Sequence, residues 1–212
     1  MFDLPEITIR SISVGDMDNN VYLITHKTSG TQVLIDAADD ANAIKTMIQE
    51  SENDTEQRPK VTHVVTTHSH WDHVRALPDI AELTGATTAA GEQDVPDIET
   101  PTDLPLKAGV LNAGGGLELE IIELRGHTPG SIALLYQDPE GPAHLFSGDS
   151  LFPGGVGNTF QDPERFATLI DDITHRVFAV LPDSTIVHPG HGARTTLGAE
   201  RPHLSEWRAR GW

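Results

Sequence analysis

The amino-acid sequence predicts a mixed α/β fold in which polar loops with potential functional groups follow the strands. Residues Ile7–Val14 alternate apolar and polar side chains, which is the period of a half-buried strand. Residues 61–85 join a β-branched run to an amphipathic helix through a polar loop, and such strand–loop–helix units build α/β folds. Asp162 and Pro163 begin a second amphipathic helix, because a capping acid followed by proline is a typical helix start.

The same patterns predict the remaining elements along the chain. Strands are expected at 20–24, 32–36, 61–67, 87–90, 117–124, 132–136, 144–149 and 185–188. A helix capped by Asp39 or Asp40 and a terminal helix at 202–210 complete the pattern. Residues 91–105 are rich in proline and acidic side chains, so we predict a surface loop there.

Length and composition bound the organisation of the chain. With 212 residues, 37% of them hydrophobic and 22% charged, it can bury a substantial core, and no linker divides it. We therefore predict a single domain over residues 1–212. No apolar run approaches the roughly 20 residues of a membrane-spanning helix. The N-terminus shows neither the basic start nor the apolar stretch of a secretory signal, so we expect a cytoplasmic protein.

Net charge and cysteine content exclude two kinds of site. The formal charge is −18, whereas non-specific nucleic-acid binding depends on lysine and arginine side chains that neutralise phosphates. We expect a small-molecule substrate, with neither nucleic acid nor a membrane as partner, and the sequence carries no signal for an oligomeric state. Because there is no cysteine, disulfides and thiolate ligands are excluded, and any metal site must use His, Asp, Glu or water.

A histidine cluster lies at the end of one predicted strand, in the segment Thr67-His68-Ser69-His70-Trp71-Asp72-His73. Three imidazoles and a carboxylate would be costly to bury, and the imidazoles would repel one another when protonated. Histidine clusters with this spacing are a recognised metal signal, since a bound cation compensates these costs. The segment therefore predicts a metal site in preference to a polar turn that happens to be rich in histidine.

Three later residues occupy equivalent positions. His127, Asp149 and His191 each lie at or just past the end of a predicted strand, beside a glycine or another small residue. Because sheets present their strand ends along a common edge, we expect these side chains to converge with the histidine cluster. Seven nitrogen and oxygen ligands suit two borderline cations, with zinc first and iron or manganese as alternatives.

Several stretches of the sequence resemble the motifs of the metallo-β-lactamase superfamily, and within it those of the glyoxalase II-like hydrolases. They occur in the family's order and span nearly the whole chain: 17–24 (MDNNVYLI), Asp36, 68–73 (HSHWDH), 126–130 (GHTPG), 148–152 (GDSLF) and 189–192 (PGHG). The resemblance implies a four-layer αββα sandwich with a dinuclear metal site at one edge.

Carried over position by position, the resemblance implies a role for each candidate ligand. The first metal ion would be bound by His68, His70 and His127. The second would be bound by Asp72, His73 and His191, and the residue that bridges both ions would be Asp149. Asp72 and Asp149 are also the candidate catalytic residues. Asp36, at the end of a predicted buried strand, is a candidate hydrogen-bond partner of a ligand histidine.

The resemblance also implies a mechanism. Two cations lower the pKa of a bridging water, and the resulting hydroxide attacks the carbonyl of a thioester or ester. A metal ion polarises the carbonyl oxygen and stabilises the oxyanion. No side-chain nucleophile is required, and Ser131 and Ser150 lack the Gly-x-Ser-x-Gly context of one. We therefore predict a metal-dependent hydrolase of the glyoxalase II-like thioesterase type, acting on a small acyl thioester or ester.

The chain departs from the glyoxalase II pattern after its last ligand. Those enzymes add a C-terminal helical domain that binds glutathione, whereas only residues 192–212 follow His191 here. We expect that domain to be absent, which weakens the case for a glutathione thioester as the substrate. Candidate substrate contacts near the site are Phe152, Asn158, Thr159, Arg125 and Arg194.

Enzymes with other activities have metal sites that resemble this one. A lactonase would use both metal ions on a cyclic ester. A persulfide dioxygenase would hold one iron at His68, His127 and Asp149, but the loop resembling GGCGRT in that family is GGVGNT at 154–159 here, which favours the hydrolase. A true β-lactamase is disfavoured because Asp149 is outside its usual ligand set. A non-catalytic scaffold is disfavoured because all seven ligands are present.

The other histidines are predicted to be surface or core residues without a metal role: His26, His63, His144, His175, His188 and His203. His188 is the closest of them in sequence to a candidate ligand, but the seven-residue set is already complete without it.

Overall fold

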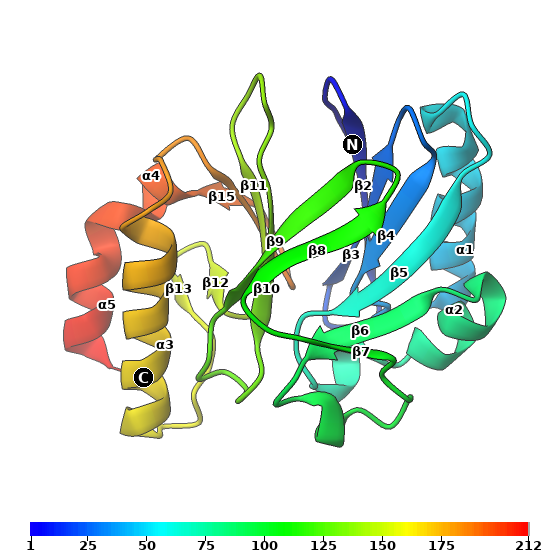
Figure 1. Ribbon diagram of the computed structural model, residues 1–212. Helices are drawn as coiled ribbons and strands as arrows, with labels where there is room; N and C mark the ends of the chain where they lie inside the picture. The colour runs from blue at the N-terminus through cyan, green and yellow to red at the C-terminus, as the bar shows by residue number, and fades with distance from the viewer. Residues whose placement is uncertain (212) are drawn as a thin grey trace.

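The computed structural model describes residues 1–211 and contains two large β-sheets that pack face to face between two layers of helices (Figure 1). The first sheet has seven strands, in order β1 (Phe2–Asp3), β2 (Ile7–Val14), β3 (Asn19–His26), β4 (Thr31–Ile35), β5 (Lys60–Thr66), β6 (Thr87–Gly91) and β7 (Leu104–Leu106). The second has six, in order β15 (Thr195–Thr196), β14 (Ile186–Pro189), β11 (His144–Gly148), β10 (Ile132–Tyr136), β9 (Leu117–Glu123) and β8 (Gly109–Gly114).

Helices cover the outer face of each sheet, which confirms the predicted αββα sandwich. On the first sheet lie α1 (Ala41–Glu50) and α2 (Leu77–Thr84), and on the second lie α3 (Pro163–Ile173) and α5 (Leu204–Arg210) (Figure 1). As predicted, Asp40 caps α1 and Asp162 caps α3, each accepting a backbone N–H of the first turn. Among residues 1–211, none of the helices combines the length and the apolar character needed to cross a bilayer.

Alternating side chains along the strands build three hydrophobic clusters, one between the sheets and one under each helical layer. In β9, Ile121 faces the other sheet, whereas its neighbour Ile122 belongs to the cluster that contains Leu169 of α3. In β4, Leu34 packs in the cluster that contains Ile44 of α1. Burying one such aliphatic side chain contributes about 1.5–3 kcal/mol, so these clusters hold the layers together.

Strand direction brings the ends of distant strands to one edge of the sandwich. In the first sheet β4, β5 and β6 are parallel, and in the second sheet β11 and β14 are parallel, so their C-terminal ends lie together. The two sheets are tied at this edge: the Asn20 amide donates to the Gly190 carbonyl at 2.7 Å, and the Tyr22 hydroxyl donates to the Pro189 carbonyl at 2.7 Å. The edge therefore holds loops from both sheets in a fixed relation.

The structure differs from the sequence prediction in five segments. Residues 91–105 are not simply a surface loop, because they contain a 3₁₀ turn (Val95–Asp97) and the start of β7. Strand β8, which was not predicted, forms a hairpin with β9 through three glycines. Helix α2 starts only at Leu77, because residues Trp71–His73 form a 3₁₀ turn instead.

The remaining differences are short elements. The glycine-rich segment after residue 150 contains a small hairpin, β12 (Leu151–Phe152) and β13 (Gly155–Val156). The predicted terminal helix is divided into α4 (Leu197–Glu200), a 3₁₀ turn (Arg201–His203) and α5, with Pro202 in the turn between the helices.

A pair of buried histidines lies between the sheets, away from the candidate ligands. His144 Nδ1 and His188 Nε2 are 2.9 Å apart, and the His188 ring stacks on Phe146 with a centroid distance of 4.7 Å. The other ring nitrogens, His144 Nε2 and His188 Nδ1, have no hydrogen-bond partner within residues 1–211. Among residues 1–211, neither side chain belongs to a group of converging ligand atoms. That His188 has a structural role and binds no metal therefore remains our prediction.

We expect this pair to make the metal-free protein sensitive to acid. Burial, reinforced by His144 and Arg194, lowers the pKa of His188 to about 3. Unfolding restores the ordinary pKa of 6.5, so the unfolded chain takes up a proton that the folded chain does not. The contribution of His188 to the free energy of unfolding is therefore constant above pH 6.5 and should fall below it, by about 1.4 kcal/mol per pH unit, until the pH reaches the folded pKa of about 3.

Urea unfolding of the chelator-treated protein at a series of pH values measures this dependence. His188→Gln cannot be protonated, and its amide can replace the ring nitrogen that faces His144, so the slope of stability against pH should be smaller. His175→Gln, at an exposed position on the surface, should keep the wild-type slope. An unchanged slope in His188→Gln would contradict the assignment.

Candidate metal centre

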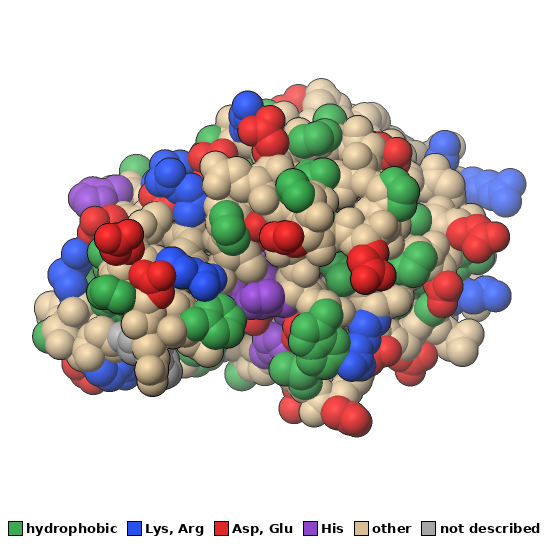
Figure 2. Space-filling view, turned by 90° about the horizontal axis from the view of Figure 1, so that it is seen from below, with side chains coloured by type: hydrophobic (Ala, Val, Ile, Leu, Met, Phe, Trp, Pro, Cys, Tyr) green, Lys and Arg blue, Asp and Glu red, His purple; other side chains and the backbone are tan. Residues whose placement is uncertain are grey.

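All seven candidate ligands lie together at the edge of the sandwich. Seen from below in the space-filling view, histidine side chains occupy a hollow between the two halves of the molecule, with hydrophobic and basic side chains on both sides (Figure 2). Their ligand atoms form three groups, within each of which the atoms lie within 4.8 Å of one another: His68, His70 and His127; His68, His73 and Asp149; Asp72, His73 and His191.

The segment after β5 supplies four of these side chains. The strand ends at Thr66, and the chain then forms the 3₁₀ turn Trp71–His73, in which the His73 amide donates to the His70 carbonyl at 3.0 Å. The tight turn allows four ligands within six positions to face a single volume. His68 and His73 are fully buried, whereas His70 is half-buried.

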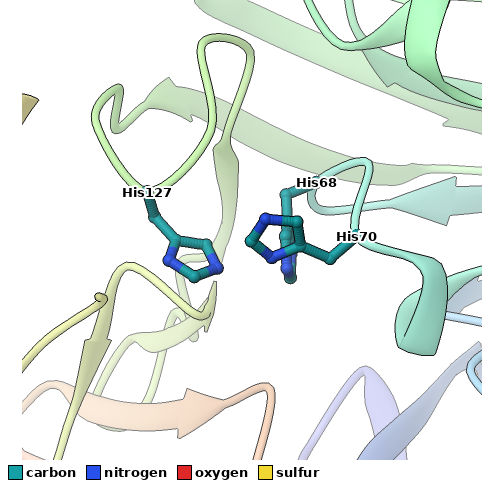
Figure 3. Close-up of side chains that lie close together, drawn as sticks. All are labelled: His68, His70 and His127. Atoms are coloured by element: carbon teal, nitrogen blue, oxygen red, sulfur yellow. The ribbon is translucent and has the colours of Figure 1, made fainter. Parts of the chain in front are cut away.

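His127 comes from the opposite loop, after β9, and faces His68 and His70 (Figure 3). The loop is held close to the rest of the protein: a Cβ at Gly126 would lie 2.5 Å from the Arg165 carbonyl, and φ of Gly126 is +132°, so glycine is required. His127 Nδ1 lies 2.9 Å from the Asn158 carbonyl. Because a carbonyl can only accept, Nδ1 carries the proton, and Nε2 presents a lone pair to the site.

Asp149 lies at the centre of the group, immediately after β11. Its carboxylate oxygens lie 3.3 Å from His191 Nε2, 3.5 Å from His73 Nε2, 3.6 Å from His127 Nε2 and 4.0 Å from His68 Nε2. One carboxylate thus lies between histidines of both proposed half-sites. This is the position that a bridging ligand requires.

Partners outside the group orient the other imidazoles in the same way. His73 Nδ1 is 3.1 Å from Asp36 Oδ2, and His191 Nδ1 is 2.8 Å from the Met17 carbonyl, so both Nδ1 atoms donate. The Thr67 hydroxyl donates to Asp36, which leaves it to accept from His68 Nδ1 at 3.1 Å. The role that the sequence suggested for Asp36, as partner of a ligand histidine, matches this geometry.

These orientations leave lone pairs facing one another. His73 Nε2 and His191 Nε2 are 3.1 Å apart although both rings already donate through Nδ1. His68 Nε2, His127 Nε2 and Asp149 Oδ1 are buried and have no hydrogen-bond partner among the described residues. Converging lone pairs without donors are unfavourable unless a cation or a proton lies between them. The donor set of nitrogen and carboxylate oxygen atoms therefore fits divalent metal ions.

The charges of the metal-free site show the same need for cations. Burial lowers the pKa of His68 well below its ordinary value, and it lowers the pKa of His127 as well. The hydrogen bond to Asp149 raises the pKa of His191 to about 9. Burial opposes ionisation of Asp149, but His191 and the neighbouring histidines outweigh it and hold the pKa of this carboxyl far below its usual value. Without metal the site therefore holds protons, which metal ions must displace.

The structure shows three supporting groups to which the sequence had given no role. Asn19 Nδ2 donates to Asp72 Oδ2 at 2.9 Å and to the Asp72 carbonyl at 3.1 Å, which orients that carboxylate. The carbonyls of Met17 and Asn158 orient His191 and His127, and the sequence does not reveal such contacts because any residue supplies a carbonyl. For Asn19, its position within the motif 17–24 was the only signal.

The two arginines predicted as candidate substrate contacts have other partners. Arg125 is paired with Asp172, with Nε 2.9 Å from Oδ2. The Arg194 guanidinium lies over the Phe2 ring at 4.8 Å. Ser131, by contrast, makes a local hydrogen bond, because its hydroxyl accepts from the Thr128 amide at 3.1 Å.

Comparison with known proteins agrees with the fold. Residues 14–191 match the family described as the metallo-beta-lactamase superfamily. A hydroxyacylglutathione hydrolase of Fuscovulum blasticum is 31% identical over 176 residues, which cover 82% of this chain and 62% of that protein. A second, from Ruegeria pomeroyi, is 33% identical with the same coverage. The chain thus spans less than two thirds of the length of these relatives.

Solved structures with the same fold include proteins of similar size. The structure of ETHE1 from Myxococcus xanthus has a TM-score of 0.79 and 26% identity, covering 95% of this chain and 85% of the other. TTHA1623 in a di-iron-bound form has a TM-score of 0.73 and 30% identity, covering 91% of this chain and 96% of the other. The fold, the clustered histidines and carboxylates and the match over residues 14–191 lead to one conclusion: the chain belongs to the metallo-beta-lactamase superfamily.

Proposed function

We propose that the protein is a dinuclear metal-dependent hydrolase that cleaves a small acyl thioester or ester. The observation that carries this proposal is the position of Asp149, whose carboxylate lies within 4.0 Å of histidines from both half-sites. The ligands of the first ion would be His68, His70 and His127. The ligands of the second would be Asp72, His73 and His191, with Asp149 shared. The di-iron-bound relative and the hydroxyacylglutathione hydrolases support both parts of the proposal.

When bound, two divalent ions would supply an activated water and polarise a carbonyl oxygen; zinc is the first expectation, with iron or manganese as alternatives. The protein's own contribution is orientation. Asp36, Asn19 and two backbone carbonyls hold the ligand side chains in place before any substrate arrives. Asp72 and Asp149 keep 10% and 17% of their side chains exposed, so a water molecule and a substrate carbonyl can reach both carboxylates.

Exposed apolar side chains at the mouth of the site offer a place for the substrate. Met17, Trp71 and Phe160 are exposed by 50%, 55% and 55%, although each neighbours or contacts a candidate ligand or the loop that supports one. The Phe160 ring stacks on His127 at a centroid distance of 6.4 Å, and the Arg165 guanidinium carbon lies 4.9 Å from the centroid of the Phe160 ring. We propose that this rim contacts the acyl or thiol part of the substrate.

Metal content and a substrate panel test the proposed function. We expect two divalent ions per chain and hydrolysis of S-D-lactoyl or simple acyl thioesters, followed as thiol release. Because the chain spans 62% of the length of the hydroxyacylglutathione hydrolases, the panel should offer the same acyl group on glutathione, coenzyme A and small thiols, together with lactones. One iron per chain and oxygen uptake with a thiol persulfide would replace the hydrolase by a dioxygenase. A chain that binds no metal would refute both.

A further inference from the structure

Asp94 is a buried carboxylate that contacts none of the candidate ligands but joins the two loops that carry them. It lies in the segment expected to be a surface loop, yet its side chain is completely buried. Oδ2 accepts from the Ser69 amide at 2.9 Å and from the Thr128 hydroxyl at 2.6 Å. Oδ1 accepts from the Gly130 amide at 2.6 Å.

These three donors flank the histidines of the first trio. Ser69 lies between His68 and His70, and Thr128 follows His127 directly. One carboxylate therefore links the segment that supplies two ligands to the loop that supplies the third. Charge-assisted hydrogen bonds of this kind are about twice as strong as neutral ones, so the link can fix the distance between the two loops.

The backbone around Asp94 leaves no space for a looser arrangement. A Cβ at Gly130 would lie 2.3 Å from the Asp94 amide nitrogen, and a Cβ at Gly91 would lie 1.9 Å from the Gly130 carbonyl oxygen. The two segments approach as closely as glycine permits, so the carboxylate meets its donors in a single geometry. All three partners donate, which suits a carboxylate, because an ionised carboxylate only accepts.

We propose that Asp94 is a positioning residue for the first metal ion: it holds the His68–His70 segment and the His127 loop at the separation that the three histidines need. Asp36 has the corresponding place in the second half-site, where it accepts from Thr67 and from His73. Asp36 also reaches the first trio through the Thr67 hydroxyl, which accepts from His68 Nδ1, whereas the loops that Asp94 joins carry the first trio. This inference rests on the proposed dinuclear centre.

Asp94→Asn is the sharpest test, because it changes the hydrogen bonding without changing the shape. The amide NH₂ must face either the Gly130 amide or the Ser69 and Thr128 donors, so at least one donor meets another donor in either orientation. We expect one of the two metal ions to bind 10–100-fold more weakly, the range typical of such supporting partners, while the other keeps its affinity. Competition titrations of the full chain with a chromophoric chelator give both dissociation constants.

Two further variants separate positioning from folding. Asp103→Asn is the matched control, because Asp103 also accepts from a backbone amide and a hydroxyl, those of Thr88, but touches neither loop; both ions should bind as in wild type. Thr128→Val removes a single donor to Asp94 and should weaken the same ion by a smaller factor, even if Asp94→Asn does not fold. If both ions bind Asp94→Asn and Thr128→Val with wild-type affinity, or if both weaken equally, the inference is wrong. Wild-type protein that binds fewer than two ions would instead refute the proposed function.

Discussion

Asp149→Ala is expected to abolish hydrolysis and to leave at most one metal ion bound per chain. The carboxylate lies between four histidine Nε2 atoms that belong to both trios, so its removal takes a ligand from each ion at once. The removal also takes away the negative charge of Asp149, which favours the binding of cations among these histidines. The loss should exceed the 10–100-fold that follows removal of an outer-shell partner. Elemental analysis and thioester hydrolysis measure the two effects.

The control for this variant is Asp172, a buried carboxylate that forms ion pairs away from the metal centre. Asp172 is buried and paired with Arg125 and Arg176, at 2.9 and 3.0 Å, on the far side of the second sheet. Asp172→Asn should lower the free energy of unfolding but keep two ions per chain. Two tightly bound ions in Asp149→Ala would show that this side chain does not bridge them.

The layers of the fold could be predicted from the sequence because the relevant signals are local. A period of two marks β2 and β9, and the capping residues Asp40 and Asp162 mark α1 and α3. Strand β8 lacks such a signal, since only Leu111 and Ala113 of its six residues are buried. It forms because β9 offers it a partner, and partners in a sheet are not visible in a single segment.

The candidate site was visible in the sequence for a related reason. Imidazole and carboxylate side chains next to glycines after strands are unusual enough to identify the segment 68–73 and the later positions one by one. The groups that orient these ligands, in contrast, have no recognisable local sequence pattern. Asp94 was placed in a surface loop because residues 91–105 are rich in proline and acidic side chains, and nothing local shows that its own carboxylate meets Ser69 and Gly130. Such roles depend on contacts between distant loops.

In the metal-free site, the fold therefore holds the ligand side chains in an arrangement that is unfavourable without bound cations. His73 Nε2 and His191 Nε2 face each other at 3.1 Å, and without metal a proton on His191 is stabilised by Asp149. Because ligand atoms are oriented by Asp36, Asn19 and backbone groups before metal binds, little reorganisation is needed when it does. Any change that moves the backbone under the ligands should then reduce metal affinity without altering a ligand.

Gly190→Ala is the change that tests this most directly, and we expect it to disrupt the centre. A Cβ at this position would lie 2.2 Å from Asp149 Oδ1 and 2.8 Å from His73 Cε1. The backbone has little freedom to move away, because the Gly190 amide donates to the Gly148 carbonyl at 2.8 Å and its carbonyl accepts from the Asn20 amide at 2.7 Å. The carboxylate must therefore shift, and overpacking of this kind also costs about 1–3 kcal/mol of stability.

The effect of Gly190→Ala should appear in metal binding and activity before it appears in folding. Asp149 is shared, so we expect both ions to bind more weakly and turnover to fall by about 100-fold or more, given how steeply catalysis depends on such positioning. Gly155→Ala is the matched control: the nearest atoms to its Cβ would be Arg210 Nη2 at 3.5 Å and Phe152 Cε2 at 3.6 Å, which are ordinary contacts. If Gly190→Ala bound both ions and turned over like Gly155→Ala, the carboxylate could not be held against Gly190 in the working enzyme. Glycine before His191 would then be needed only for the backbone conformation of the turn, and not to leave room for the Asp149 carboxylate.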